Sequence, residues 1–533
     1  MKKVLSMSLA AALMLAALFI GCQNLDVQNQ NQPDEARALA TPSDIESLIK
    51  SSFLGWFDGH MDAEPSMGLA VMSDAYTCGW GNFGMSVLSQ EPRTEFTNTS
   101  SYGRANITEN PWFNLYSAIS SATDGIRNIS DGTVTLGAAD DKRALAFAKF
   151  VQGLSHGWLS LYFDQAFIFD ENVDLNTFNP QDELKPYTEV NAAAIAMLED
   201  AITQFNATAF TLPADWIRLR TYTSAELARI AHSYIARYMI DVARSPAERR
   251  FTDGYWATVL THLDQGITED FEVTGIGAGR HEPWWSAVHW YGRDWGTWLR
   301  ADYHLIGPSD PTSGYADWAA LSPSDRDEFI FPSSDLRVWD GTLDANGDQN
   351  SGLYFDQLGP TGFPGQAQRR SRYGHNRFTE YRFESDAGSP VPIYRTQEHD
   401  FIRAEALLHM GGSTAEIAAL LDKYHVDNGG YTTTATLAVG SITDNPNPLH
   451  AQGATLWSVL KYEKRIELLG TSSGLEFFTN RAWGELSPRT LLHFPVPAKD
   501  LETLGFALYS HGGTRGDVAK RSSKPQLIPP QAY

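Results

Sequence analysis

The chain is short of cysteine: two occur among its 533 residues, Cys22 and Cys78. Two cysteines cannot build the disulfide framework of many small secreted proteins, and without a CxxC pair they offer no zinc motif. We expect Cys78 to be a small buried apolar residue. Basic residues are also few, 41 Lys and Arg against 64 Asp and Glu, for a net charge of −23. Because such a surface repels a phosphate backbone, no nucleic-acid partner is expected.

Motifs of catalytic and cofactor-binding sites are missing or stand in the wrong context. The fourteen histidines form no HExxH zinc motif. The stretch Gly470–Gly474 has the letters of the G-x-S-x-G nucleophile elbow, but the charged, helical KYEKRIELL precedes it where the elbow needs a strand. We predict the end of a helix and a turn there. The glycines from Gly275 to Gly279 do not lead into a helix, so we expect a turn and no nucleotide site. Neither an enzymatic activity nor a cofactor is predicted.

The N-terminus has the pattern of an export signal. Two lysines precede an apolar run from Val4 to Ile20, which ends at Gly21-Cys22. This run is too short for a comfortable membrane span, and no later run is longer. A small residue followed by cysteine resembles a bacterial lipobox, in which Cys22 becomes the lipidated first residue; the alternative is a soluble secreted protein with an incidental cysteine. We predict a signal peptide at 1–21 and a polar tether at 22–40, with lipid as the membrane anchor.

Helical periodicity dominates most of the remaining chain. Thr223 and Glu226 form a capping box at the clearest helix, whose apolar stripe leaves Arg237 and Asp241 mainly on the other side. The first predicted helix begins at Thr41-Pro42. The others lie around Trp256 and at residues 111–129, 138–162, 187–205, 223–243, 396–410, 414–424 and 455–469.

Periodicity is lost from about Gly275 to Pro392, where Gly, Pro, Ser, Asp and aromatic residues abound. We predict a mainly α fold of helical hairpins similar to tetratricopeptide units, although no strict repeat of about 34 residues is present. In this division, residues 41–274 form the N-terminal hairpin part, 275–392 an irregular, loop-rich insertion subdomain, and 393–533 the C-terminal helices and tail that pack back on the first part.

Two segments are rich in aromatic residues. His281–Trp298 holds five of the fifteen tryptophans, and Asp74–Gly84 mixes rings with glycines. Sugar rings present flat apolar faces edged with hydroxyls, so aromatic rings suit the faces, and Asp or Asn suit the hydroxyls. Tryptophan is usually well buried, so we expect about half of these rings to belong to the core. The candidate ligand-binding residues are Asp74, Trp80, Asn82, Phe83, Trp284, Trp285, Trp290 and Trp295.

A third segment offers alternating oxygen ligands. Asp344, Asn346 and Asp348 have the spacing of a calcium loop, but Phe355 stands where such a loop has its twelfth-position Glu. A polar turn is the default interpretation, and a calcium site is the alternative.

Several stretches, in order along the chain, resemble the SusD/RagB family of outer-membrane nutrient-binding lipoproteins. They are NLDVQNQNQPDEARALATPSDIESLI, WFNLYSAISSATDGIRNI, AKFVQGLSHGWLSLYFDQAF, IRAEALLHMGG, KYEKRIELLGTSSGLEFFTNRAWG and HFPVPAKDLETLG. In the fifth, Glu463, Arg465, Glu467 and Leu468 match the family pattern, whereas Thr479-Asn480 replace its Asp-Leu. The resemblance covers nearly the whole chain after Cys22.

The resemblance implies four tetratricopeptide-like hairpins with an irregular subdomain, and no catalysis. It implies a lipid-anchored protein at the surface of the outer membrane, which covers a SusC-like TonB-dependent transporter and delivers oligosaccharides to it. Family ligand sites use aromatic residues of a loop after the second helix and of the mid-chain insertion, which correspond to Asp74–Gly84 and His281–Trp298. The alternatives are a peptide or other nutrient as ligand, a secreted glycoside hydrolase, or a helical scaffold that only docks to a membrane partner.

Overall fold

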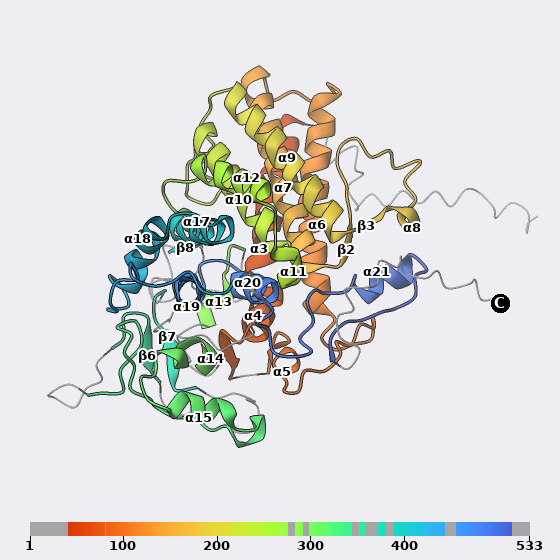
Figure 1. The fold of residues 1–533 in the computed structure, drawn as a ribbon. Coiled ribbons are helices and arrows are strands. Elements are labelled where there is room, and N and C mark those ends of the chain that lie inside the picture. Colours follow the sequence, from red (N-terminus) through yellow and green to blue (C-terminus); the bar gives the residue numbers. More distant parts are fainter. Residues whose placement is uncertain are drawn as a thin grey trace, which may run out of the picture.

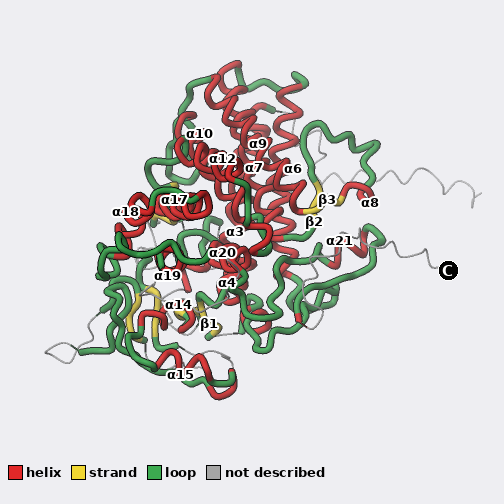
Figure 2. Tube along the Cα trace, in the orientation of Figure 1, coloured by secondary structure: helices red, strands yellow, loops and turns green. Residues whose placement is uncertain are grey.

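The computed structural model of the chain describes residues 41–79, 81–275, 283–291, 298–343, 351–358, 371–378, 389–442 and 455–513. Helices are its main regular structure, and the strands are short and paired two by two (Figure 1 and Figure 2). The mainly α fold class predicted from the sequence is confirmed. None of the helices in these ranges is both long and apolar enough to cross a membrane.

The long helices pack as a consecutive array, in which each contacts the next along the chain. They are α3 (Pro42–Met61), α6 (Asn106–Ser130), α7 (Ala138–Tyr162), α9 (Tyr187–Ala207), α10 (Ser224–Asp241), α12 (Asp253–Asp264), α17 (Thr396–Met410), α18 (Thr414–His425) and α19 (Leu456–Glu467). Stacking of neighbouring helix pairs buries a continuous core, as in tetratricopeptide-like proteins. The predicted hairpin architecture is therefore what the chain adopts (Figure 1).

Shorter helices connect and cover this array. They are α4 (Ala63–Met72), α5 (Met85–Leu88), α8 (Pro180–Glu183), α11 (Pro246–Arg249), α13 (Ala287–Tyr291), α14 (Tyr303–Ile306), α15 (Gly314–Ala320), α20 (Leu475–Trp483) and α21 (Ala498–Thr503), with 3-10 turns at Gly307–Ser309 and Pro323–Asp325. The helix α20 lies near the centre of the molecule in Figure 1, and every one of its residues is buried.

The strands form antiparallel pairs between segments far apart in sequence. The pairs are β1 (Tyr76–Cys78) with β5 (Leu299–Ala301), β2 (Gln165–Phe167) with β3 (Leu184–Pro186), β4 (Phe271–Thr274) with β8 (Pro390–Tyr394), and β6 (Phe355–Gln357) with β7 (Tyr373–His375). The strands β4 and β8 stand at the two limits of the predicted 275–392 subdomain, so its ends are tied together. The division of the chain into parts stays a prediction.

Helix boundaries follow the caps that the sequence displays. Thr41 and Asp44 form a capping box at α3, and Thr223 and Glu226 form one at α10, as predicted. The helix α6 begins five residues before the predicted Pro111, which lies inside it. Pro111 is the sixth residue of α6, beyond the first turn where proline is best tolerated, and buried Ile107 and Thr108 extend the packed face upstream of it.

Two polar residues of α10 lie where periodicity did not predict them. Arg237 and Asp241 are buried, at 0% and 2% exposure, so their predicted placement away from the packed side is wrong. The guanidinium of Arg237 forms a two-pronged ion pair with Glu398 of α17, at 2.8 and 2.7 Å, and lies over the Tyr394 ring. A buried charge is tolerated when it is paired in this way. Cys78 is buried, as predicted.

Candidate functional site

The pairing of β1 with β5 joins the two aromatic segments of the sequence. Tyr76 lies opposite Ala301, Cys78 lies opposite Leu299, and the Gly79 N–H donates to the Trp298 carbonyl at 3.0 Å. The ends of Asp74–Gly84 and His281–Trp298 are therefore held side by side, although more than two hundred residues separate them.

Two rings meet beside this ladder. The rings of Phe83 and Trp298 have their centroids 5.9 Å apart and are tilted by 40°. Both residues, and Asn82 next to them, are half-buried. We call Asn82, Phe83 and Trp298 the aromatic surface. Trp298 was not among the predicted ligand-binding residues, and its place in the tryptophan-rich stretch was the only signal for it.

Trp284 is a third half-buried ring, and it packs against α3. It stacks on Phe53 at 6.0 Å between centroids and lies 5.4 Å from Phe57. Burial raises the pKa of Asp58 to about 7, and the charge of Asp62 adds to this, while a hydrogen bond from the Trp284 backbone acts in the opposite direction. Trp284 is thus anchored by its ring and by its main chain.

Backbone strain gathers in the same two segments. Five non-glycine residues in the described part of the chain have positive φ, and three of them are predicted ligand-binding residues: Asp74 (56°), Phe83 (53°) and Trp284 (69°). This left-handed conformation is unfavourable for residues with a Cβ and often occurs at functional sites.

Asp74 and Trp285 lie in the interior. The Asp74 carboxylate pairs with Arg93 at 2.7 Å and accepts from the Ser487 hydroxyl at 2.7 Å, and the residue is 5% exposed. Trp285 is 1% exposed. Neither side chain faces solvent in this structure, and their role in ligand binding stays a prediction.

The other predicted site residues fall outside the described part. Trp80, Trp295, Cys22, and Asp344, Asn346 and Asp348 of the candidate calcium loop lie there, and Trp290 is on α13 with its side chain outside it. Among the residues that are described, no three His, Cys, Asp or Glu side chains are grouped to hold a metal ion.

The Gly470–Gly474 motif is a turn, as predicted. It joins the end of α19 to α20, and Gly470 and Gly474 have positive φ, of 70° and 74°. Ser472 is 3% exposed and follows a helix, whereas a nucleophile elbow follows a strand and exposes its serine.

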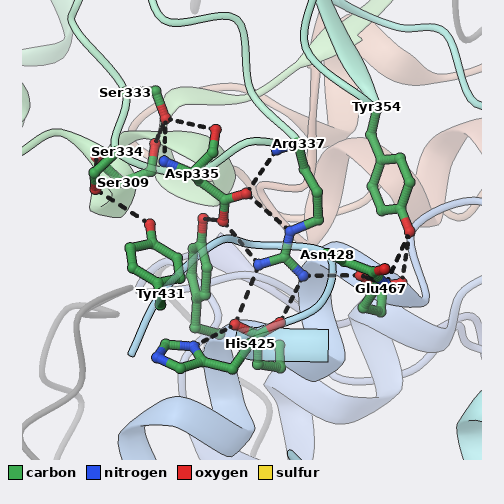
Figure 3. Close-up of polar contacts among 12 residues, drawn as sticks. Ser309, Ser333, Ser334, Asp335, Arg337, Tyr354, His425, Asn428, Tyr431 and Glu467 are labelled. Carbon is green, nitrogen blue, oxygen red and sulfur yellow. Dashed lines mark hydrogen bonds and ion pairs between the residues drawn. The ribbon is translucent and has the colours of Figure 1, made fainter. Parts of the chain in front are cut away.

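A buried ionic group joins the irregular region to the C-terminal helices (Figure 3). The Arg337 guanidinium contacts the carboxylates of Asp335, Glu463 and Glu467 at 2.7, 2.5 and 2.8 Å, and all four side chains are fully buried. Burial would lower the pKa of Arg337, but Glu463 and Asp335 outweigh it and hold that pKa well above its ordinary value.

Neutral side chains complete this group, which we call the Arg337 cluster. The hydroxyls of Tyr354 and Tyr462 donate to Glu467 and Asp335, the Asn428 amide donates to Glu467 at 2.9 Å, and His425 hydrogen-bonds Glu463. The cluster ties the segment after α15 to α18 and α19. The carboxylates of the cluster all accept hydrogen bonds or form ion pairs within the chain. The cluster therefore has a structural role.

The fold is that of the SusD superfamily. Similar solved structures include a SusD superfamily protein from Parabacteroides distasonis ATCC 8503 (TM-score 0.57, covering 86% of this chain and 97% of that chain) and one from Bacteroides fragilis (0.53; 87% and 98%). A third is surface glycan-binding protein A from Bacteroides uniformis (0.51; 87% and 99%). All three are 14% identical in sequence to this chain. No family model and no curated protein matches the chain.

Proposed function

We propose that the protein is a surface lipoprotein that binds oligosaccharides with its aromatic surface and delivers them to a TonB-dependent outer-membrane transporter of the SusC type. One observation carries the binding proposal: β1 and β5 bring the two aromatic segments together, with the half-buried rings of Phe83 and Trp298 side by side. The SusD fold supports it, and one similar protein is by name a surface glycan-binding protein. In this proposal the protein binds and does not catalyse.

The chemistry of these residues suits a sugar. Two inclined rings offer apolar faces to the C–H faces of neighbouring sugar units, and the Asn82 amide offers both a donor and an acceptor to hydroxyls. Anchoring through lipid on Cys22 rests on the lipobox-like sequence, and the transporter partner rests on the family resemblance.

Calorimetric titration against maltoheptaose, laminarihexaose, xylohexaose and a peptide panel tests the binding proposal. For the oligosaccharide that the wild type binds, we expect Trp298→Ala and Phe83→Ala each to raise Kd at least about tenfold, because central aromatic contacts dominate such interfaces. Phe113→Ala is the matched control, since Phe113 is an exposed ring on α6, 39% accessible. Binding to peptides alone would replace the oligosaccharide by a peptide as ligand, and release of shorter sugars would identify a hydrolase.

A further inference from the structure

Four side chains from three segments converge on Gly470, at the start of the turn between α19 and α20. A Cβ on Gly470 would lie 3.4 Å from the Tyr76 hydroxyl, 3.4 Å from the Phe378 ring and 3.5 Å from the His375 ring. The His289 ring is the fourth side chain, and the polar backbone of Gly470 is near enough to act on the pKa of that ring. We call these five residues the Gly470 junction. The three distances are ordinary van der Waals distances, so a Cβ would fit among the side chains, and it is the φ of 70° at this position that favours glycine.

The junction is held by one polar contact and a set of ring contacts. The Tyr76 hydroxyl hydrogen-bonds Nδ1 of His375 at 2.8 Å, and both residues are buried. Phe378 meets His289 edge to face at 4.7 Å and His375 at 5.5 Å. His289 in turn hydrogen-bonds Ser286 at 2.6 Å. Contacts of this kind fix side-chain positions within a close-packed interior.

Both imidazoles are neutral in this setting. Burial lowers the pKa of His375 well below its ordinary value, helped by the charge of Arg377 and by His289, and burial lowers the pKa of His289 to about 3. The Tyr76–His375 bond therefore persists over the whole neutral range and does not depend on protonation.

The junction links both aromatic segments a second time. Tyr76 belongs to Asp74–Gly84, His289 belongs to His281–Trp298, and His375 and Phe378 lie between them. The first link, the β1–β5 ladder, fixes the two main chains at Cys78 and Leu299. The ladder and the junction hold the two segments at different points, and together they restrain rotation of one segment relative to the other. A ladder of three residue pairs alone would leave this rotation less restrained.

The junction also stands on a rigid base. Arg377, next to Phe378, donates to the Glu467 carbonyl at 2.5 Å and lies over the Tyr354 ring, 4.4 Å from its centroid. Glu467 and Tyr354 both belong to the Arg337 cluster (Figure 3). A change in the position of His375 would therefore be resisted from this side as well.

We propose that Tyr76 and His375 are positioning residues of the ligand-binding surface: through Phe378 and His289 they set how the Phe83 ring lies relative to the Trp298 ring. This inference rests on the proposed function. The ring pair is a site only while the two rings keep their mutual distance and tilt, and neither Tyr76 nor His375 touches the ligand.

The test compares Tyr76→Phe with Tyr238→Phe. Each substitution removes one buried hydroxyl and keeps the ring; Tyr238 donates to the Leu154 carbonyl at 2.8 Å between α10 and α7. Both proteins are labelled with 5-fluorotryptophan, and Trp298→Phe assigns the Trp298 resonance. We expect Tyr76→Phe to shift that fluorine resonance and to raise the oligosaccharide Kd about fivefold, within the range that coupled positions produce. Tyr238→Phe should do neither, at an equal loss of stability.

The outcomes separate the two proposals. Equal behaviour of Tyr76→Phe and Tyr238→Phe in Kd and in the Trp298 resonance overturns the positioning role, even when the wild type binds oligosaccharide. If no oligosaccharide binds to the wild type, the proposed function fails, and the Trp298 resonance alone then decides whether Tyr76 positions that ring.

Discussion

The Arg337 cluster and the aromatic surface use their side chains in opposite ways. In the cluster, charged groups with 0% exposure saturate one another, so that nothing is left to bind an outside molecule. In the aromatic surface, uncharged side chains remain half-buried, and one of them, Phe83, has a positive φ of 53°. The strongest interactions of this protein therefore do not mark its proposed binding site. They hold the irregular region in place, and incompletely buried rings beside it form the surface proposed for a ligand.

The largest effect is expected from Arg337→Met. Removal of the guanidinium leaves three buried carboxylates without their shared partner, and breaking a buried ion pair costs about 3–5 kcal/mol of unfolding free energy. Urea denaturation would measure this loss. Lys50→Met is the control, because the Lys50–Asp215 pair is largely exposed, with side-chain accessibilities of 40% and 64%, and such pairs contribute less than about 1 kcal/mol. If both variants lost the same unfolding free energy, the Arg337 cluster would contribute no more to stability than an exposed ion pair.

A second expected effect is a fall in stability with rising pH that originates at Glu476 of α20. Burial raises the pKa of Glu476 to about 7 from an ordinary value of 4.5, so the folded protein holds a proton that the unfolded chain releases. The stability from this proton is complete below pH 4.5, declines as pH rises, and is lost above pH 7.

Glu476→Gln isolates this contribution. The amide keeps an acceptor for the Gly470 N–H, which lies 3.2 Å from the carboxyl oxygen, but it cannot ionise. Between pH 5 and pH 8 we expect the wild type to lose on the order of 2 kcal/mol more unfolding free energy than the variant. A wild type and variant with parallel pH profiles would contradict the raised pKa. The pH dependence of stability would then not distinguish Glu476, a buried carboxyl with no arginine in contact among the described residues, from the carboxylates that Arg337 contacts.

The sequence predicted the helical part of the molecule well because its signals are local. Capping boxes such as Thr223–Glu226 and the apolar pattern of Ala138–Tyr162 depend on residues a few positions apart. The burial of Arg237 depends on Glu398, 161 residues away. The Arg337 cluster likewise assembles residues from Asp335 to Glu467, and no local pattern announces it.

For the proposed site, the sequence pointed to two segments, which the structure brings together, but not to the arrangement of the individual side chains. Both aromatic segments were recognised from composition, and their approach through β1 and β5 agrees with the resemblance. With three residues each, β1 and β5 are too short to show the alternation of apolar and polar residues that predicts a strand. Which rings face solvent follows from tertiary packing, so Trp285, Trp284 and Trp298, all within fifteen residues, are buried in one case and half-buried in two.

The smallest effects are expected from an Asn→Ala substitution made once in the aromatic surface and once in the Arg337 cluster. Asn82→Ala removes an amide of the aromatic surface and should raise the oligosaccharide Kd about threefold to tenfold, the value of one neutral hydrogen bond, with no loss of unfolding free energy. Asn428→Ala removes the amide that donates to Glu467 in the Arg337 cluster, so about 1 kcal/mol of stability should be lost while Kd stays unchanged. Calorimetric titration and urea denaturation of both variants give four values. If Asn82→Ala altered stability and Asn428→Ala altered Kd, the assignment of binding to one region and of structural support to the other would be reversed.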